Sequence, residues 1–215
     1  MLLGSVFLAM MCVAGIHWTC WLLPPLLAAP VLYFGILLFS PVRLARLTSF
    51  MDPEKYKDTI GYQLWNSQLA LGSGEWVGVG FAESRLKLKY LPEAHTDFIL
   101  SIVGEELGFV MVLLVIIAYL ILMFTGIRIS QKSRNLQGMF TAYGMIIFII
   151  IQAVINLGVV CGAFPTKGMP APMISYGGSN LIACMIAAGC VFSVALDSAY
   201  PDYHLDIQQK LRNIQ

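Results

Sequence analysis

An acidic, histidine-containing segment at the start of a long apolar run is the part of the sequence best suited to chemistry. Glu93, His95 and Asp97 place two carboxylates and an imidazole within five positions, directly before Phe98. The apolar run over 98–124 can cross a bilayer, since a spanning helix needs about 20 apolar residues. Ionisable groups at a membrane surface cost desolvation energy unless something there uses them. The segment therefore predicts a membrane-embedded active site that acts on a lipid-anchored substrate.

Cationic side chains lie in two other polar segments. Lys167 is in a Gly- and Pro-rich loop with Ser175 and Ser179, whose hydroxyl and backbone N–H groups are further donors for an anion. Arg43 and Arg46, three residues apart, would share one face of a helix. An acid among cations suits a phosphate-bearing, lipid-linked substrate. Plainer alternatives remain open, because surface arginines also extend to lipid headgroups and a loop lysine is often only a solvated charge.

Four polar side chains fall inside the apolar segments themselves. Glu105 and Glu106 lie about two turns into the run that begins near residue 98, where isolated charge is costly. At least one of them is expected to face the protein interior or a wet cavity, in a packing role or in contact with substrate. Gln152 and Asn156, four residues apart, share one helix face and are expected to hydrogen-bond to a neighbouring helix.

Composition places the chain in a membrane and argues against several function classes. Of its 215 residues, 58% are hydrophobic and 12% are charged, whereas a typical soluble domain is about 25% charged. The net charge of +1, without any run of lysine or arginine, gives no support to nucleic-acid binding. The five cysteines form no CxxC pair, and no metal-ligand spacing is present. We therefore expect no cofactor held by a dedicated motif.

The apolar segments predict an all-α integral membrane protein, a polytopic helical bundle that forms one domain over 1–215. The long polar connections 41–97 and 162–179 and a polar tail at 197–215 separate or follow the spans. The first span begins without the charged leader of a signal peptide, which predicts that the chain is the later part of something longer. The five expected spans are at about residues 2–17, 22–40, 98–124, 139–161 and 180–196.

Basic residues near the span ends predict the orientation. Cations occupy the short connection at 125–138 and the C-terminal tail, whereas Lys167 is the only cation in the loop at 162–179. Cytoplasmic short loops carry the excess of lysine and arginine. The C-terminus is therefore expected in the cytoplasm, with both long polar connections outside. A count that includes the cations of 41–97 gives the opposite orientation, but long loops cross largely regardless of charge.

Several motifs occur in an order that is specific to one family. They are the segments 43–53, 61–63, 70–74, 90–98, 104–108, 165–168 and 174–179. Together they resemble the SEDS family (shape, elongation, division and sporulation), integral membrane proteins that polymerise lipid II into peptidoglycan glycan strands. The resemblance covers nearly the whole chain. Within the family, residues 93–94 and 165–168 resemble the cell-division member more than the elongation member.

The resemblance implies a fold and a function. The family fold has ten transmembrane helices, and the spans here would be the last five, with 41–97 as the large extracytoplasmic loop. Members transfer a glycan from a lipid-diphosphate donor onto the 4-hydroxyl of a second lipid-linked disaccharide, with inversion. The protein is then expected in the bacterial cytoplasmic membrane at the division septum. The implied partners are lipid II, a class B penicillin-binding transpeptidase and other division proteins.

The resemblance also assigns roles to individual side chains. The family's essential aspartate matches Asp97, which would take the acceptor's hydroxyl proton as general base. Lys167 and Arg43 would contact the diphosphate and stabilise the leaving group as it gains charge. Glu93 and His95 would orient Asp97 or the sugar. From the residues alone, Asp97 is equally consistent with a helix cap or an interfacial acid.

The sequence leaves other functions open. A transporter of the lipid-linked precursor would need carboxylates deep in the membrane, such as Glu105 and Glu106, more than an acid at the surface. An elongation-type polymerase would perform the same chemistry in a different complex, and a half-length chain could be a scaffold. A divalent cation could be held by one or two carboxylates with the substrate phosphates, without any motif.

Overall fold

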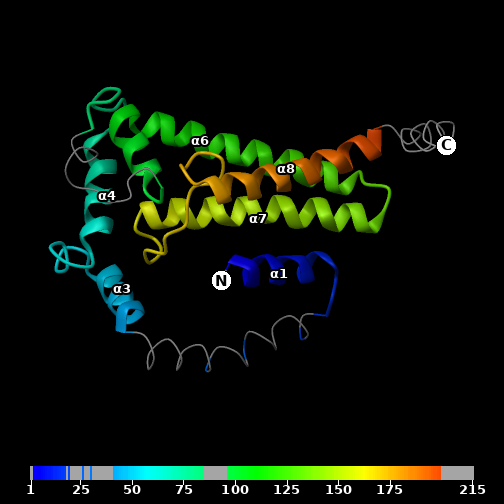
Figure 1. Ribbon diagram of the computed structural model, residues 1–215, viewed down its shortest axis with the longest axis horizontal. Helices are drawn as coiled ribbons and strands as arrows, with labels where there is room; N and C mark the ends of the chain where they lie inside the picture. Colours follow the sequence, from blue (N-terminus) through cyan, green and yellow to red (C-terminus); the bar gives the residue numbers. More distant parts are fainter. Residues whose placement is uncertain are drawn as a thin grey trace.

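The computed structural model describes residues 2–17, 19, 26, 30, 41–84 and 96–199. In this part of the chain every regular element is an α-helix, and three helices are long and apolar enough to cross a membrane. The predicted class, an all-α polytopic membrane bundle, is confirmed (Figure 1). Most of the predicted span at 22–40 lies outside the described residues. The helices are α1 (Leu2–Val13), α3 (Pro41–Met51), α4 (Tyr62–Ser73), α6 (Ile99–Gln131), α7 (Leu136–Val160) and α8 (Gly178–Ala199).

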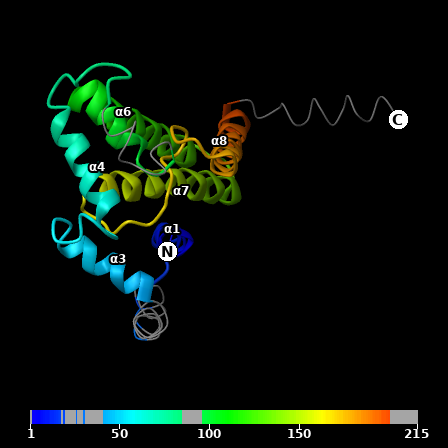
Figure 2. The same ribbon diagram turned by 60° about the vertical axis from the view of Figure 1, so that its left-hand side comes forward.

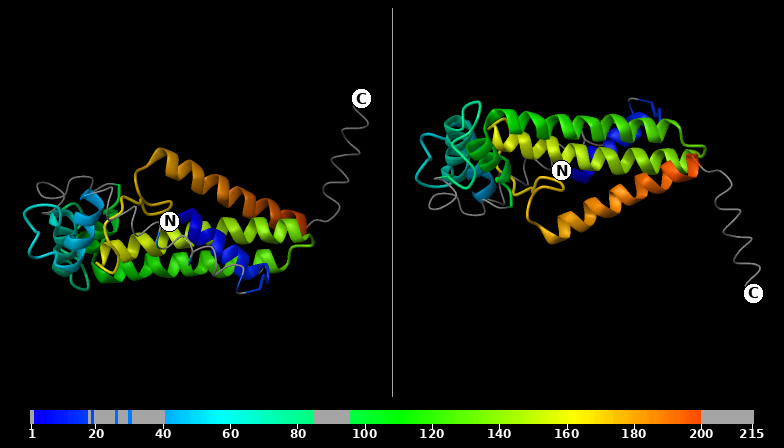
Figure 3. Two further views of the ribbon diagram at one scale, coloured as in Figure 1. Left: turned by 90° about the horizontal axis from the view of Figure 1, so that it is seen from below. Right: turned by 90° about the horizontal axis from the view of Figure 1, so that it is seen from above.

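The long helices α6, α7 and α8 lie side by side and give the bundle two distinct ends (Figures 1 and 3). At one end a short turn, 132–135, joins α6 to α7. At the other end the long loop 161–177 joins α7 to α8, and α4 runs across the ends of α6 and α7 (Figures 1 and 2). We call this second end the loop end. It brings together the polar segments that the sequence singled out.

The apolar stretch of α6 matches the thickness of a bilayer. From Phe109 to Ile127 the helix carries no charged side chain, and at 1.5 Å per residue this stretch rises by about 28 Å. The hydrocarbon core of a bilayer is about 30 Å thick. Phe109 therefore marks one edge of the apolar layer, and Arg128 marks the other. The first turns of α6, before Phe109, lie beyond that layer at the loop end.

A kink separates the two parts of α6. Gly108 has φ 76° and ψ −179°, a conformation that side chains with a Cβ rarely adopt. The segment 75–80 runs past the kink and exchanges backbone hydrogen bonds with it, which satisfies groups that the interrupted helix frees. These bonds run from the N–H of Phe109 to Glu75 O (2.9 Å), Val110 to Trp76 O (3.3 Å), Val79 to Glu105 O (2.9 Å) and Gly80 to Glu106 O (3.1 Å).

A compact apolar core fixes the loop end. It joins the start of α6, the end of α7 and the loop 161–177 through buried side chains that include Phe98, Val160 and Ala171. Buried serines connect α4 to the same core, since Ser67 Oγ lies 2.7 Å from Ser101 Oγ and donates to Val160 O at 3.2 Å. The backbone on either side of Phe98, including Asp97, is consequently held in place by packing.

Candidate active site

A cavity of about 560 Å³ opens at the loop end of the bundle. Its volume lies in the range of small-molecule sites, about 300–1,000 Å³. It forms where α3 and its following turn, the start of α4, the residues before α6 and the loop 161–177 meet. The lining residues are Arg46, Asp58, Thr59, Ile60, Tyr62, Gln63, Asp97, Phe98, Thr166 and Gly168.

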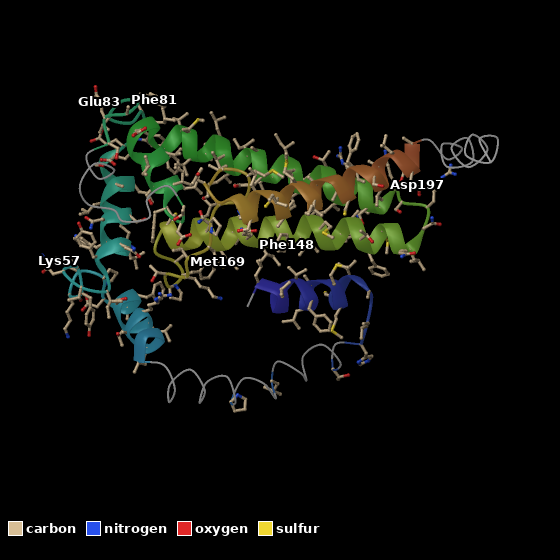
Figure 4. The ribbon with its side chains drawn as sticks, viewed as in Figure 1. Lys57, Phe81, Glu83, Phe148, Met169 and Asp197 are labelled. Atoms are coloured by element: carbon tan, nitrogen blue, oxygen red, sulfur yellow. The ribbon has the colours of Figure 1, made fainter. Side chains whose placement is uncertain are left out.

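Asp97 is half-buried in the cavity wall and is held through its own backbone. The side-chain amide of Asn156, on α7, donates to Asp97 O at 2.9 Å and to Met169 O at 2.6 Å. Asn156 is only 1% exposed, so water does not compete for these two bonds. Figure 4 shows Met169 on the loop beside the end of α7. One buried amide thus joins the acidic segment to the loop that carries Lys167.

The same loop approaches the Asp97 carboxylate directly. Gly168 has φ +58°, and a Cβ added there would lie 3.2 Å from Asp97 Oδ2. The absence of a side chain therefore lets the loop backbone pack against the carboxylate. Lys167, the preceding residue, is half-buried, and this burial lowers the pKa of its ammonium group. The side chain of Lys167 is not among the groups that line the cavity, although both of its neighbours are.

Further side-chain donors hold the rest of the loop. Gln152 Nε2 donates to Pro170 O at 3.0 Å and to Asn180 Oδ1, on α8, at 2.6 Å. The phenol of Tyr119, on α6, donates to Pro172 O at 2.7 Å. The bond to Asn180 is the expected contact with a neighbouring helix, whereas the other bonds reach loop carbonyls. The loop therefore enters the bundle, where irregular backbone is stable because it is enclosed by protein.

Two of the predicted site residues meet in the cavity, and three others lie wholly or partly outside the described residues. Arg46 and Asp97 line the cavity together. Glu93 and His95 lie outside the described residues, and so does the side chain of Arg43, whose backbone belongs to α3.

The two predicted serines do not line the cavity. Ser175 is buried, and its Oγ accepts a hydrogen bond from the Ala171 N–H at 2.7 Å, which closes a turn of the loop. Ser179 is exposed in the first turn of α8. Ser175 therefore has a structural hydrogen bond within the loop, and its contact with substrate stays a prediction.

Glu105 and Glu106 are both buried just before the kink of α6. Ser84 Oγ donates to Glu105 Oε2 at 2.5 Å, so this carboxylate also holds the end of the segment that follows α4. Neither glutamate lines the cavity. Both lie on the loop-end side of Gly108 and not in the middle of the apolar layer.

Sequence reasoning missed Asp58 and did not assign a role to Tyr62 or Gln63, all of which line the cavity. Tyr62 and Gln63 could have been found from the 61–63 motif. No sequence signal indicated Asp58, because an acid in a polar turn after a helix is usually a solvated charge. Among the described residues no three His, Cys, Asp or Glu side chains form a metal cluster. The cavity does, however, contain two carboxylates, Asp58 and Asp97.

Fold and site define a polytopic membrane protein with a cavity at one end that combines carboxylates, an arginine and a lysine-bearing loop. The FtsW/RodA/SpoVE family of cell cycle proteins matches residues 1–200. The chain belongs to this family, and the resemblance drawn from its motifs is confirmed.

Individual relatives support the assignment. Proteins named probable peptidoglycan glycosyltransferase FtsW are similar to it: that of Trichlorobacter lovleyi is 39% identical over 90% of this chain and 50% of its own. That of Hydrogenovibrio crunogenus is 41% identical over 91% of this chain and 51% of its own. The chain thus spans about half the length of these relatives. A solved chain described as part of a peptidoglycan synthase complex is 28% identical, with a TM-score of 0.69 over 89% of this chain and 53% of that one.

Proposed function

We propose that the cavity is part of the active site of a peptidoglycan glycosyltransferase of the cell-division type, which polymerises lipid II. The observation that carries the proposal is the contact between Asp97 and the loop bearing Lys167, made through Asn156 and Gly168. It holds the Asp97 carboxylate, in the cavity wall, against the loop that carries the Lys167 ammonium group. The names of the relatives support this reaction class.

In this reaction Asp97 acts as general base. Its carboxylate accepts the proton of the acceptor's 4-hydroxyl while the hydroxyl oxygen attacks the anomeric carbon of the donor. A carbon–oxygen bond forms to the acceptor, and the bond from the anomeric carbon to the diphosphate oxygen breaks. The electron pair leaves on the diphosphate, and the anomeric configuration inverts. Arg46 and Lys167, with Arg43 on the same helix as Arg46, stabilise the charge that develops on the leaving group.

Asn156 serves this reaction as a positioning residue. Its two hydrogen bonds fix the separation between the base and the loop of the anion-binding lysine. A displacement of about 1 Å between catalytic groups can lower a rate roughly a hundredfold. The amide therefore affects the rate without touching the substrate.

The donor set of the cavity also suits one divalent cation. Hard cations take carboxylate oxygens and often share substrate phosphates. Asp58 and Asp97 are the side chains that would hold such a cation, which would supply further neutralisation of diphosphate charge.

The cavity faces the extracytoplasmic side in this proposal. Arg128, Lys132 and Arg134 gather at the opposite end of the bundle, around the turn at 132–135, and cytoplasmic short loops are rich in such cations. The C-terminus would then be cytoplasmic, in the inner membrane at the division septum. A class B penicillin-binding transpeptidase is the proposed partner, in keeping with the description of the solved neighbour as coordinating polymerization and crosslinking.

A transporter is less well supported. It would use carboxylates in the middle of the apolar layer, whereas Glu105 and Glu106 lie beyond its edge and Glu105 accepts a hydrogen bond from Ser84.

The two functions are separated by one reconstitution. The protein, with any coding sequence upstream of Met1 and with the transpeptidase, is placed in liposomes that contain lipid II. Glycan strands on a gel, without faster movement of lipid II between leaflets, are expected. Faster movement of lipid II without glycan strands would contradict the polymerase and support the transporter.

A further inference from the structure

A short apolar segment outside the helices is strongly exposed at the loop end. Trp76 is 69% exposed, Val77 82% and Phe81 81%. These residues lie between the end of α4 and Ser84, on the side of α6 away from α7 (Figures 1 and 2). Figure 4 shows Phe81 at the outermost turn of this segment, next to Glu83. Exposed apolar side chains that gather in this way mark a surface that contacts a membrane or another protein.

The depth of this segment relative to a bilayer follows from its contacts with α6. The Trp76 ring meets the Phe109 ring edge to face, with centroids 5.5 Å apart and planes at 89°. The Val110 N–H donates to Trp76 O at 3.3 Å. Since the uncharged stretch of α6 begins at Phe109, Trp76 lies level with one edge of the apolar layer. That edge is the headgroup region, where tryptophan is enriched in membrane proteins.

The apolar surface continues from the segment onto α6. Phe109, Leu113 and Ile117, four residues apart on one helix face, are 49%, 43% and 41% exposed. A surface of this kind along the middle of a spanning helix is suited to contact with lipid tails. Trp76 and Val77 extend the same surface beyond the kink.

We propose that residues 75–81 form a membrane-interface anchor, in which Trp76, Val77 and Phe81 insert between the headgroups of the leaflet at the loop end. Tryptophan suits this location because its ring is apolar while its indole N–H can still reach water or a headgroup. The carboxylates of Glu75 and Glu83, at either side of the apolar residues, stay toward the water. The anchor does not depend on the proposed reaction.

The anchor also fixes the depth of the neighbouring part of α6. The segment 75–80 is joined to residues 105–110 by four backbone hydrogen bonds. A Cβ at Gly78 would lie 2.2 Å from Glu106 O, so the two backbones pack without room for a side chain. Holding the segment at the headgroups thereby holds the start of α6, and with it Asp97, at a set distance from the bilayer.

Tryptophan fluorescence in lipid nanodiscs tests the anchor directly. A variant that retains only Trp76, with Trp18, Trp21 and Trp65 changed to Phe, is placed in phosphatidylcholine brominated either near the headgroups or near the chain ends. Emission should be quenched more by the shallow bromines than by the deep ones. A matched variant that retains only Trp65, which lines a groove on α4, should be quenched severalfold less. Equal, weak quenching of the two proteins would overturn the proposal and leave the surface to a protein partner.

A second measurement keeps the test decisive if the triple substitution disturbs the fold. A nitroxide is attached at Phe81→Cys in a background without the native cysteines, with Glu54→Cys, in the exposed turn after α3, as control. Dissolved oxygen should relax the label at 81 more than a water-soluble nickel complex does, and the reverse should hold at 54. Preference for the nickel complex at both positions would contradict the anchor.

Discussion

Two irregular segments pack against the loop end of the bundle, and they are held in different ways. The loop 161–177 is held by buried side chains. The amides of Asn156 and Gln152 and the phenol of Tyr119 donate to three carbonyls of the loop, at residues 169, 170 and 172. The segment 75–80 is held by backbone hydrogen bonds to the kinked part of α6.

The two kinds of contact should respond differently to substitution. A backbone contact depends on glycines that let two chains approach, and it is indifferent to most other side chains. A loop held by side chains can be shifted by a single substitution on a distant helix, and this is the loop that meets Asp97. Substitutions should therefore affect stability at segment 75–80 and activity at loop 161–177.

The largest expected effect on stability is that of Gly74→Ala, at the start of the backbone-held segment. A Cβ there would lie 1.9 Å from Gly104 O, and neither backbone can yield cheaply. Overpacking of this kind typically costs about 1–3 kcal/mol, occasionally more, and we expect at least the upper value in detergent unfolding curves. The control is Gly72→Ala, which meets nothing within 4 Å and should stabilise α4 by about 0.5–1 kcal/mol. Equal midpoints for the two variants would contradict the close backbone contact.

Asn156→Asp should give the largest loss of activity among the residues that hold the loop. The substitution keeps the size of the side chain but replaces its donor with an acceptor that faces Asp97 O and Met169 O. The polymerisation rate should fall roughly a hundredfold, in kcat more than in KM. The matched control, Asn66→Asp, removes a bond confined to α4 and should change the rate little. A fall in melting temperature without a change in kcat would make Asn156 merely structural.

A smaller loss is expected for Gly168→Ala. The positive φ of Gly168 disfavours any other residue by about 1–2 kcal/mol, and the new Cβ would lie 3.2 Å from Asp97 Oδ2. If this strain is relieved by moving the loop, the rate should drop about tenfold. Gly178→Ala, where no atom lies within 4 Å of the added Cβ, is the control. Unchanged rates for both would show that the loop does not touch the base.

The smallest effect is a pH dependence that originates at Lys167. Because burial lowers the pKa of its ammonium group, the cation is lost at a lower pH than for an ordinary lysine. Polymerisation should decline as pH rises through that lowered pKa, and Lys167→Arg should retain activity to higher pH. Stability should change in the opposite direction, since the unfolded chain binds the proton more tightly and folding is favoured as pH rises through this window. If the polymerisation rates of the parent and Lys167→Arg declined identically at alkaline pH, Lys167 would be excluded as the origin of the decline.

Sequence patterns predicted the fold class and the family because both rest on signals that are long and repeated. Apolar runs of bilayer length and several ordered motifs leave few alternatives. The same patterns placed Asp97 and Arg46 in one site, where the structure also has them. They did not reveal the kink at Gly108 or the partners of Asn156. A glycine can indicate a close backbone contact and a buried amide a hydrogen bond, but neither residue type identifies the group that it contacts. Asp58 was missed because only tertiary folding brings its turn to the cavity.

Replacing each cavity carboxylate in turn shows whether Asp97 is the general base of a lipid II polymerase. Initial rates of glycan-strand formation are measured for the parent, Asp97→Asn and Asp58→Asn in liposomes, with folding checked by thermal unfolding. Asp97→Asn keeps the shape of the side chain but cannot accept the proton, so it should abolish strand formation, while Asp58→Asn should retain measurable activity. Strand formation by folded Asp97→Asn at the parent rate would contradict it.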